Sequence, residues 1–467
     1  MFAASLIGGQ NYYLSKELEI VAAEIEFGTD GVRGLHPDVI NEEIVRNLAA
    51  AQVADWYERY DEPPQLFIGG DTRPSTPALI DAAVKGALEA GAHVIEVGTQ
   101  PTPVIAWLAK RHGVGAIAIT ASHNPSGENG FKPFAPGGDK YGRDILSNIE
   151  KLYWQINFNG RRHYPGGHAR QDHGLATQYV DQMVNKLGGS DVLGGKIVVV
   201  DGAYGAAHNL APQLYRGLGA QVIPFACSTR GKINNNVGAA HLNGVKSFLR
   251  KLNLATDPNF LGALSFDGDA DRVMGVDAAQ REINGNHWLH QLAPGQLGIV
   301  GTIYTNSGLE EALAVMGVPL YRSGTGDYQV TTELRKRNLR FGGEPSGHII
   351  DTEHLSSGDG LFIGGRMLAD LALREMTMRD IFDTVTLWPE DMNNIRVGGN
   401  AKALVDSVPF QNGVRAIEAR YDGAVNTIVR ASGTEQGLVR VWVEGRMQEM
   451  VKDAKKRLRS QLAEYMG

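Results

Sequence analysis

Cysteine is almost absent from this 467-residue chain, whose one thiol is Cys227, and long apolar runs are absent altogether. A single cysteine excludes an internal disulfide and a metal site of several thiolates, so we expect a small buried thiol in a cytoplasmic protein. No run approaches the roughly 18 apolar residues that span a membrane, and the apolar start at Met1–Ile7 has no basic residue before it. We therefore expect neither a signal peptide nor a membrane partner.

Basic residues are also in the minority, with 45 Lys and Arg against 52 Asp and Glu, a formal net charge of −7. Nucleic acids and anionic membranes require clustered Lys and Arg, so we expect no nucleic-acid partner. A phosphorylated ligand would need a local positive site in this acidic chain. The sequence contains neither a Gly-x-x-x-x-Gly-Lys-Ser/Thr nucleotide loop nor a Gly-x-Ser-x-Gly esterase motif.

Strand and helix patterns alternate along most of the chain, which predicts strand–helix–strand units and mainly parallel sheets. The length suits three or four domains, each with its own core. We expect an α/β protein with three tandem α/β domains of mainly parallel mixed sheets and a smaller α+β C-terminal domain, around a central cleft. The expected ranges are an N-terminal extension at 1–23, α/β domains at 24–170, 171–280 and 281–388, and the α+β domain at 389–467.

A polar turn at Thr120–Pro125 follows the continuous apolar run Gly115–Ile119. Such a run, bounded by turn residues, is typical of a buried parallel strand, and ligands of open α/β sheets bind where these strands end. An isolated serine after a strand usually does no more than cap a loop. Ser122 is a candidate active-site residue because three further polar loops accompany it.

The first of these loops, Asp267–Arg272, follows the apolar strand pattern Leu261–Phe266. Its carboxylates alternate at Asp267, Asp269 and Asp271, and so many negative charges in one turn are tolerable mainly with a cation bound. Carboxylate oxygens favour Mg²⁺, with Ca²⁺ as a second choice. An EF-hand is excluded because Arg272 and Ala278 stand where that motif requires Gly and Glu. We expect Arg272 to balance the excess charge and contact the substrate.

Two other loops carry groups that could hold a polar ligand. Glu344, Ser346 and His348 alternate, so on an extended backbone their side chains would point the same way and read neighbouring hydroxyl groups. The Arg430–Thr434 loop offers a guanidinium, two hydroxyls and backbone N–H groups, which together make an anion nest. Its candidate phosphate-binding residues are Arg430, Ser432, Gly433 and Thr434.

These four loops, in this order and with the glycine-rich segment Phe27–Gly34, resemble the α-D-phosphohexomutase family from about Glu26 to the C-terminus. The resemblance implies that Ser122 carries a phosphoryl group and holds Mg²⁺ together with the three aspartates. It also implies that Arg33 and His123 face the phosphoserine and that Lys132 transfers the proton. A sugar 1,6-bisphosphate would be intermediate and activator, and the Arg430 loop would hold the phosphate that is not reacting.

The implied partner is a phosphorylated hexose or hexosamine, with a monomer and a homodimer both open. Three segments are most similar to the branch that interconverts glucosamine 6-phosphate and glucosamine 1-phosphate, a step toward cell-wall amino sugars: Phe27–Gly34, Thr305–Leu309 and Gly343–His348. A mannose or glucose phosphate mutase with the same mechanism is the alternative. The chain departs from the family pattern at Gly70 before Asp71-Thr72-Arg73, at Asn284–Asn286, at Tyr328 and at Gln436.

Two rival interpretations assign these residues differently. An aspartyl-phosphate phosphatase would use Asp267 as nucleophile, but it would leave Ser122 and the Arg430 loop without roles. A non-catalytic sugar-phosphate binding protein is the other rival. It is disfavoured because Ser122, Lys132 and the three aspartates are all present.

Overall fold

The computed structural model describes residues 25–28, 30–159, 166–432 and 437–463. The expected N-terminal extension at 1–23 therefore lies outside the described residues. The chain forms two compact units, one running up to Tyr304 and including Val318–Thr384, the other combining Thr305–Gly317 with the chain from Val385 onward. The described residues form four sheets, three in the first unit and one in the second.

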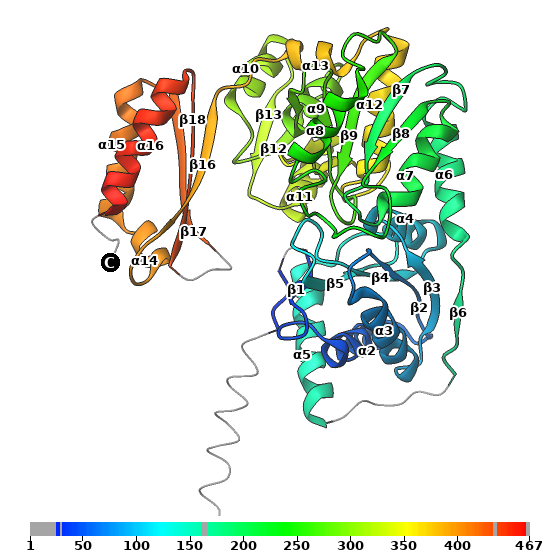
Figure 1. Cartoon of the computed structure of the whole chain (residues 1–467). Coiled ribbons are helices and arrows are strands. Elements are labelled where there is room, and N and C mark those ends of the chain that lie inside the picture. Colours follow the sequence, from blue (N-terminus) through cyan, green and yellow to red (C-terminus); the bar gives the residue numbers. More distant parts are fainter. Residues whose placement is uncertain (1–24, 29, 160–165, 433–436, 464–467) are drawn as a thin grey trace, which may run out of the picture. The chain divides into compact units, whose positions relative to one another are not determined.

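The first sheet is mixed, with a parallel centre and an antiparallel edge (Figure 1). In spatial order its strands are β1 (Val32–Leu35), β5 (Glu128–Phe134), β4 (Gly115–Ile119), β2 (Gln65–Gly70), β3 (His93–Thr99) and β6 (Ala169–Gln171). β2 pairs in parallel with β3 and β4, whereas β5 runs antiparallel to β4 and β1. Every residue of β4 is buried, as the apolar run before Ser122 predicts.

Four helices surround this sheet: α2 (Glu42–Arg59), α3 (Thr76–Glu89), α4 (Thr102–His112) and α5 (Arg143–Asn159). Helices α2, α3 and α5 share one apolar core with the sheet, and α4 lies on the other face (Figure 1). A parallel sheet with both faces covered is the arrangement that strand–helix–strand units produce.

The second sheet begins where the α/β pattern restarts. Its order is β11 (Glu282–Ile283), β10 (Val273–Val276), β9 (Phe260–Phe266), β7 (Ile197–Asp201) and β8 (Gln221–Phe225). β7 is parallel to β8 and β9, and β10 returns antiparallel to β9 after the aspartate loop. The accompanying helices are α6 (Leu175–Lys186), α7 (Ala207–Gly217), α8 (Asn243–Leu252), α12 (Gly360–Leu373) and α13 (Met378–Thr384). Helix α8 packs onto the sheet through Val245 and Leu249.

The third sheet has the order β13 (Leu320–Ser323), β12 (Ile299–Thr302), β14 (Phe341–Gly343) and β15 (Ile349–Asp351). β12 is parallel to both neighbours, and β14 and β15 form an antiparallel hairpin. Helices α9 (Gly285–Leu292) and α11 (Asp327–Arg337) pack against β14. The expected fold class, with mainly parallel mixed sheets, is confirmed by these three sheets.

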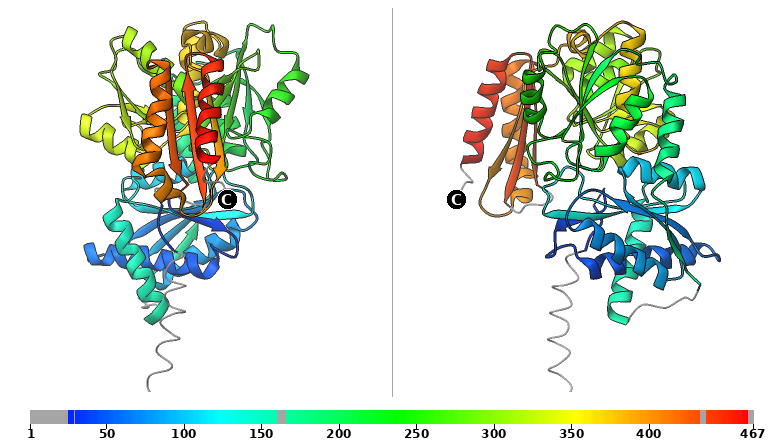
Figure 2. Two further views of the ribbon diagram at one scale, coloured as in Figure 1. Left: turned by 90° about the vertical axis from the view of Figure 1, so that its left-hand side faces the viewer. Right: turned by 45° about the vertical axis from the view of Figure 1, so that its right-hand side comes forward.

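The second unit has one antiparallel sheet, with the order β16 (Glu390–Arg396), β18 (Leu438–Gly445), β17 (Val425–Ala431). Helices α15 (Val408–Glu418) and α16 (Gln448–Ala463) pack on this sheet around a core of their own, side by side in Figure 2. The shorter elements are α14 (Ala401–Val405) and the 3₁₀ turn Ala419–Tyr421, and α10 (Ser307–Val315) also belongs to this unit. The expected domain ranges stay predictions.

Candidate active site

Ser122 lies in the turn directly after β4, with no exposed surface and with its backbone in the left-handed region at φ +52°. Its N–H donates to Thr120 Oγ1 at 2.9 Å, which fixes the start of the turn. Its Oγ donates to Asp267 Oδ2 at 2.7 Å and lies 3.4 Å from His123 Nδ1. The candidate nucleophile is therefore in direct contact with the aspartate loop of the second sheet.

Arg73 supports this turn through hydrogen bonds to its backbone carbonyl groups. Its guanidinium donates to the carbonyl oxygens of Ser122 at 2.8 Å, Asn124 at 2.9 Å, Glu128 at 2.8 Å and Pro125. Its Nε donates to Asp71 Oδ2 at 2.9 Å, and both side chains are fully buried. Removing one partner of a buried ion pair costs about 3–5 kcal/mol of folding free energy. The Arg73–Asp71 pair therefore supports the turn rigidly. The sequence analysis assigned Arg73 no role, although Asp71-x-Arg73 directly after a buried strand was a usable signal.

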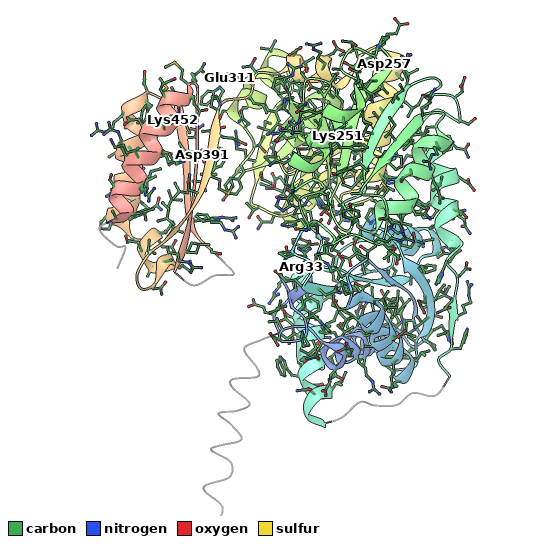
Figure 3. The ribbon with its side chains drawn as sticks, viewed as in Figure 1. Arg33, Lys251, Asp257, Glu311, Asp391 and Lys452 are labelled. Atoms are coloured by element: carbon green, nitrogen blue, oxygen red, sulfur yellow. The ribbon has the colours of Figure 1, made fainter. Side chains whose placement is uncertain are left out.

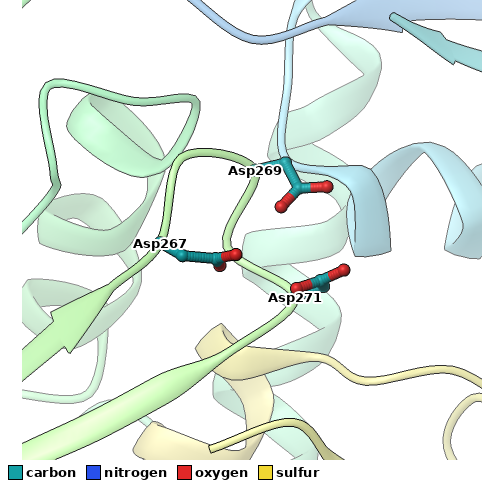
Figure 4. Close-up of side chains that lie close together, drawn as sticks. All are labelled: Asp267, Asp269 and Asp271. Carbon is teal, nitrogen blue, oxygen red and sulfur yellow. The ribbon is translucent and has the colours of Figure 1, made fainter. Parts of the chain in front are cut away.

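The three aspartates occupy the loop between β9 and β10 and face one another (Figure 4). Asp267, Asp269 and Asp271 are at most 4% exposed, and one oxygen from each lies within 4.8 Å of the others. Asp269 Oδ2 accepts from Thr102 Oγ1 at 2.8 Å. The Oδ1 atoms of Asp269 and Asp271 are buried and have no hydrogen-bond partner among the described residues. Hard oxygen ligands with unused lone pairs in a buried cluster fit a divalent cation such as Mg²⁺.

The charges around this cluster are unevenly compensated. Burial, with Asp271 and Asp269 close by, raises the pKa of Asp267 well above its usual range. Burial also acts to raise the pKa of Asp271, but Lys132, His348 and Arg272 lower it well below its usual value. The environment favours the protonated form of Asp267. A bound cation would stabilise the charged form of all three carboxylates.

Gly268 permits the aspartate loop and the serine turn to touch. A Cβ at this position would lie 2.5 Å from Ser122 O and 2.8 Å from Asn234 Nδ2. Asn234 itself donates to Ser122 O at 2.7 Å and to Asn124 O at 3.1 Å, so a third loop holds the same turn. The sequence analysis missed Asn234, because nothing in its local sequence separates it from an ordinary turn asparagine.

Three cationic side chains surround the carboxylates. Lys132, on β5 and 2% exposed, places Nζ 2.7 Å from Asp269 Oδ2 and 3.3 Å from Asp271 Oδ2. Arg272 donates its backbone N–H to Asp267 Oδ1 at 3.2 Å, and its side-chain Nε lies 3.8 Å from Asp271 Oδ1. Arg33, labelled in Figure 3, lies on β1 next to β5, opposite Gly130. These groups supply the local positive charge that an acidic chain needs to meet a phosphate.

His123 is uncharged at neutral pH. Arg272, burial and Arg33 together lower its pKa to about 3. With Pro125, Ser126 and the loop at 232–236, it lines a pocket of about 690 Å³ beside the serine turn. His123 can therefore donate or accept a hydrogen bond next to Ser122 without contributing a charge.

The expectation of an extended backbone at Gly343–His348 is wrong. The segment is the tight turn of the β14–β15 hairpin, in which Glu344 N–H donates to His348 O at 3.0 Å and Gly347 has φ +88°. Because the chain reverses, the three side chains take different surroundings. Glu344 Oε1 accepts from Gly326 N–H at 3.0 Å, whereas His348 Nδ1 lies 3.6 Å from Asp271 Oδ1. Ser346 Oγ is buried without a hydrogen-bond partner among the described residues.

Arg430 and Ser432 belong to the second unit, at the end of β17. Ser432 N–H donates to Leu438 O at 2.8 Å. Ser432 lines a pocket of about 380 Å³ together with Gly437 and the segment 399–402, which includes Lys402. The candidate residues Gly433 and Thr434 lie outside the described residues.

Comparison with known proteins agrees with this combination of sheets and loops. Two family models match: phosphoglucomutase/phosphomannomutase, alpha/beta/alpha domain I over residues 24–160 and domain III over residues 271–387. The chain belongs to this phosphohexomutase family, so it is an isomerase, a sugar-phosphate mutase. Membership favours the mutase over both rival interpretations.

The chain is similar to curated relatives named phosphoglucosamine mutase. It is 34% identical over 442 residues to that of Thermus thermophilus, covering 93% of this chain and 97% of the relative. It is 36% identical over 433 residues to that of Saccharopolyspora erythraea, covering 90% and 95%.

Solved structures share the fold. A phosphoglucomutase/phosphomannomutase family protein of Burkholderia thailandensis matches with TM-score 0.75 at 22% identity, covering 93% of this chain and 97% of that one. The N-acetylphosphoglucosamine mutase of Aspergillus fumigatus, in complex with GlcNAc-6P and magnesium, matches with TM-score 0.63 at 16% identity, covering 96% and 98%. In the part of the chain that the structure describes, none of the helices has the length and apolar character needed to cross a bilayer.

Proposed function

We propose that this chain interconverts glucosamine 6-phosphate and glucosamine 1-phosphate through a phosphoserine at Ser122 and a 1,6-bisphosphate intermediate. The substrate rests on the relatives named phosphoglucosamine mutase, which are 34–36% identical over most of the chain. The mechanism rests on one observation, the contact of Ser122 Oγ with Asp267 within a buried aspartate cluster.

The reaction is a transfer of one phosphoryl group between Ser122 Oγ and a sugar hydroxyl. The serine O–P bond breaks as the sugar O–P bond forms. Lys132, whose Nζ lies 2.7 Å from Asp269 Oδ2, accepts the hydroxyl proton in its neutral form, and a proton returned to Ser122 Oγ restores the serine hydroxyl. Arg33 and Arg272 offset the negative charge of the transferring group, and His123 donates a hydrogen bond to it. Such transfer depends chiefly on positioning and charge stabilisation, which these residues supply.

Asp267, Asp269 and Asp271 would hold Mg²⁺ with an oxygen of the phosphoryl group on Ser122. When bound, the ion lowers the charge on the group that the sugar hydroxyl attacks. The chain's own contribution is the fixed separation of Ser122 from these carboxylates, maintained by Gly268 and Asn234.

Substrate orientation is assigned to two further loops. Glu344, Ser346 and His348 bind the sugar hydroxyls, and the unpartnered Ser346 Oγ is the group best able to accept a new hydrogen bond. Arg430, Ser432, Gly433 and Thr434 hold the phosphate that is not reacting.

The test is isomerisation of glucosamine 1-phosphate, glucose 1-phosphate and mannose 1-phosphate side by side, with Mg²⁺ and a trace of the matching 1,6-bisphosphate. We expect preference for the glucosamine substrate and loss of turnover in EDTA that added Mg²⁺ restores. Preference for glucose or mannose phosphate would contradict only the assignment of an amino-sugar substrate and would leave the mechanism unchanged. Turnover unaffected by chelation would contradict the role of the three aspartates.

A further inference from the structure

Lys140 joins two carboxylates that come from different sheets. It lies between β5 and α5, and its side chain, 15% exposed, forms ion pairs with Asp30 and Asp327. Asp30 precedes β1 of the first sheet, and Asp327 is the first residue of α11 beside the third sheet. One ammonium group therefore connects the two sheets that carry the candidate proton-transfer residue and the candidate sugar-binding turn.

Each of the two carboxylates also contacts a candidate active-site residue. Asp30 forms an ion pair with Arg33, and its Oδ2 lies 3.3 Å from Lys132 Nζ. Asp327 Oδ2 lies 3.5 Å from His348 Nε2, but that nitrogen accepts a hydrogen bond from Gly358 N–H at 2.9 Å and so has no proton for Asp327. Lys132 and His348 then meet at one carboxylate, because Lys132 Nζ is 3.3 Å from Asp271 Oδ2 and His348 Nδ1 is 3.6 Å from Asp271 Oδ1. We call these six side chains the ionic ring: ion pairs join Asp271, Lys132, Asp30, Lys140 and Asp327 in that order, and His348 lies between the two ends.

The ring is largely shielded from water, with only Asp30 and Lys140 exposed beyond one tenth. Burying charges is costly unless each is paired, and a buried ion pair adds little stability over apolar residues of the same size. Its benefit is geometric, since Lys132 is held between Asp271 and Asp30, and Lys140 between Asp30 and Asp327. Asp30, Lys140 and Asp327 have no part in the proposed chemistry, yet Lys140 fixes Asp30, which contacts both Lys132 and Arg33.

We propose that Lys140 is a positioning residue, which is anchored by Asp327 and through Asp30 holds Lys132 beside Asp271. The inference rests on the proposed function, because it assigns Lys132 to proton transfer. Removing Lys140 leaves substrate recognition by the other loops in place but lets the reacting groups shift. The cost should therefore fall on kcat more than on KM.

The test compares Lys140→Met with Asp139→Asn, a matched change in the same loop. Among the described residues, the side chain of Asp139 pairs with Arg335 and accepts a hydrogen bond from Ser356 Oγ, and neither partner belongs to the ionic ring. With the substrate that the unmodified chain prefers, we expect kcat of Lys140→Met to fall about 10- to 100-fold, with KM within about threefold. Asp139→Asn should keep the unmodified kcat.

A second comparison separates positioning from folding. Lys140→Met leaves Asp327 buried without its cation, so its melting temperature should fall, and Lys140→Met/Asp327→Asn removes that unpaired charge. Asp327→Asn alone is the second single variant. We expect the double variant to regain thermal stability while its kcat stays as low as that of either single variant, as expected of residues acting as one unit. Three outcomes would each overturn the proposal. The first is that the double variant regains kcat together with its thermal stability, and the second is that its loss of kcat is the product of the losses in the two single variants. The third is that Lys140→Met keeps the unmodified kcat.

The outcome is separable from that of the proposed function. Substrate preference is read from the unmodified chain, whereas the role of Lys140 is read from the ratio of variant to unmodified kcat on the same substrate. A chain that prefers mannose phosphate but loses kcat in both Lys140 variants would contradict the glucosamine assignment and support the ionic ring.

Discussion

Ser122 has an unusual set of contacts for a serine in a turn. Its carbonyl oxygen accepts hydrogen bonds from Arg73 and Asn234, its hydroxyl donates to Asp267, and its side chain has no exposed surface. A hydroxyl held this rigidly loses little conformational entropy when it reacts. At the scale of single residues, the position of this candidate active-site hydroxyl is thus set by the backbone of the turn as much as by the side chain.

The first prediction concerns this hydroxyl. Ser122→Ala should abolish turnover and prevent the mass increase of one phosphoryl group on incubation with the 1,6-bisphosphate, because no other group replaces Oγ. Ser126→Ala, in the same turn and half-buried, is the matched control and should keep both properties. Intact-mass spectrometry with the isomerisation assay checks this. A phosphorylated, active Ser122→Ala protein would contradict the mechanism.

At the scale of elements, helix α9 depends on a histidine that the sequence analysis did not consider. Asn284 caps the helix, and His287 Nδ1 accepts from Asn284 N–H at 3.2 Å, which completes a capping box. His287 is 2% exposed, and burial, with His290 and Arg281 nearby, lowers its pKa to about 4. The helix is therefore capped by a neutral imidazole.

The second prediction follows from this pKa. The unfolded chain protonates the histidine near pH 6.5 and the folded chain only near pH 4, so its contribution to stability is present above pH 6.5 and lost as the pH falls toward 4. Between pH 7 and pH 5 the unfolding free energy should drop by about 2 kcal/mol relative to His287→Gln, which keeps the capping box without titrating.

Urea denaturation at both pH values measures this difference. The control is His241→Gln at an exposed histidine, which should follow the pH dependence of the unmodified chain. Identical pH dependence of His287→Gln and the unmodified chain would show that His287 is not held neutral by burial.

At the scale of the whole molecule, segments distant in sequence form the second unit. Glu444 on β18, 1% exposed, accepts from Ser307 N–H at 3.0 Å, from Ser307 Oγ, and from Asn426 Nδ2 at 2.8 Å. Glu311 on α10, labelled in Figure 3, also pairs with Arg446 just after β18. Helix α10 is therefore held to the C-terminal sheet at both its start and its exposed side.

The third prediction tests that connection. Glu444→Gln should speed hydrogen exchange of the α10 amides by about tenfold or more, because its N–H₂ faces donors and cannot replace a charge-assisted hydrogen bond. Amides of β4 in the first unit should not change. Glu449→Gln, exposed on α16, is the matched control. Unchanged exchange in α10 would mean that Glu444 does not hold the helix.

The local sequence pattern was sufficient to predict the strands and the residue types of the candidate site. The apolar runs before Ser122 and Asp267 are β4 and β9, because a buried strand needs continuous apolar side chains wherever it occurs. The alternate aspartates face one another because a tight loop brings side chains from neighbouring positions together. Motif identity and the family resemblance could therefore be read from the sequence.

Only the tertiary structure decided which of these groups touch and what supports them. Arg73, Asn234 and Lys140 contact partners on other elements, and no local period or spacing encodes such partners. The expected extended run at Gly343–His348 failed for the same reason, since a backbone hydrogen bond within the hairpin, and not side-chain alternation, sets its shape. Sequence determined the elements and their chemical groups, while packing between sheets determined their contacts, because contact energies depend on distance in space and not along the chain.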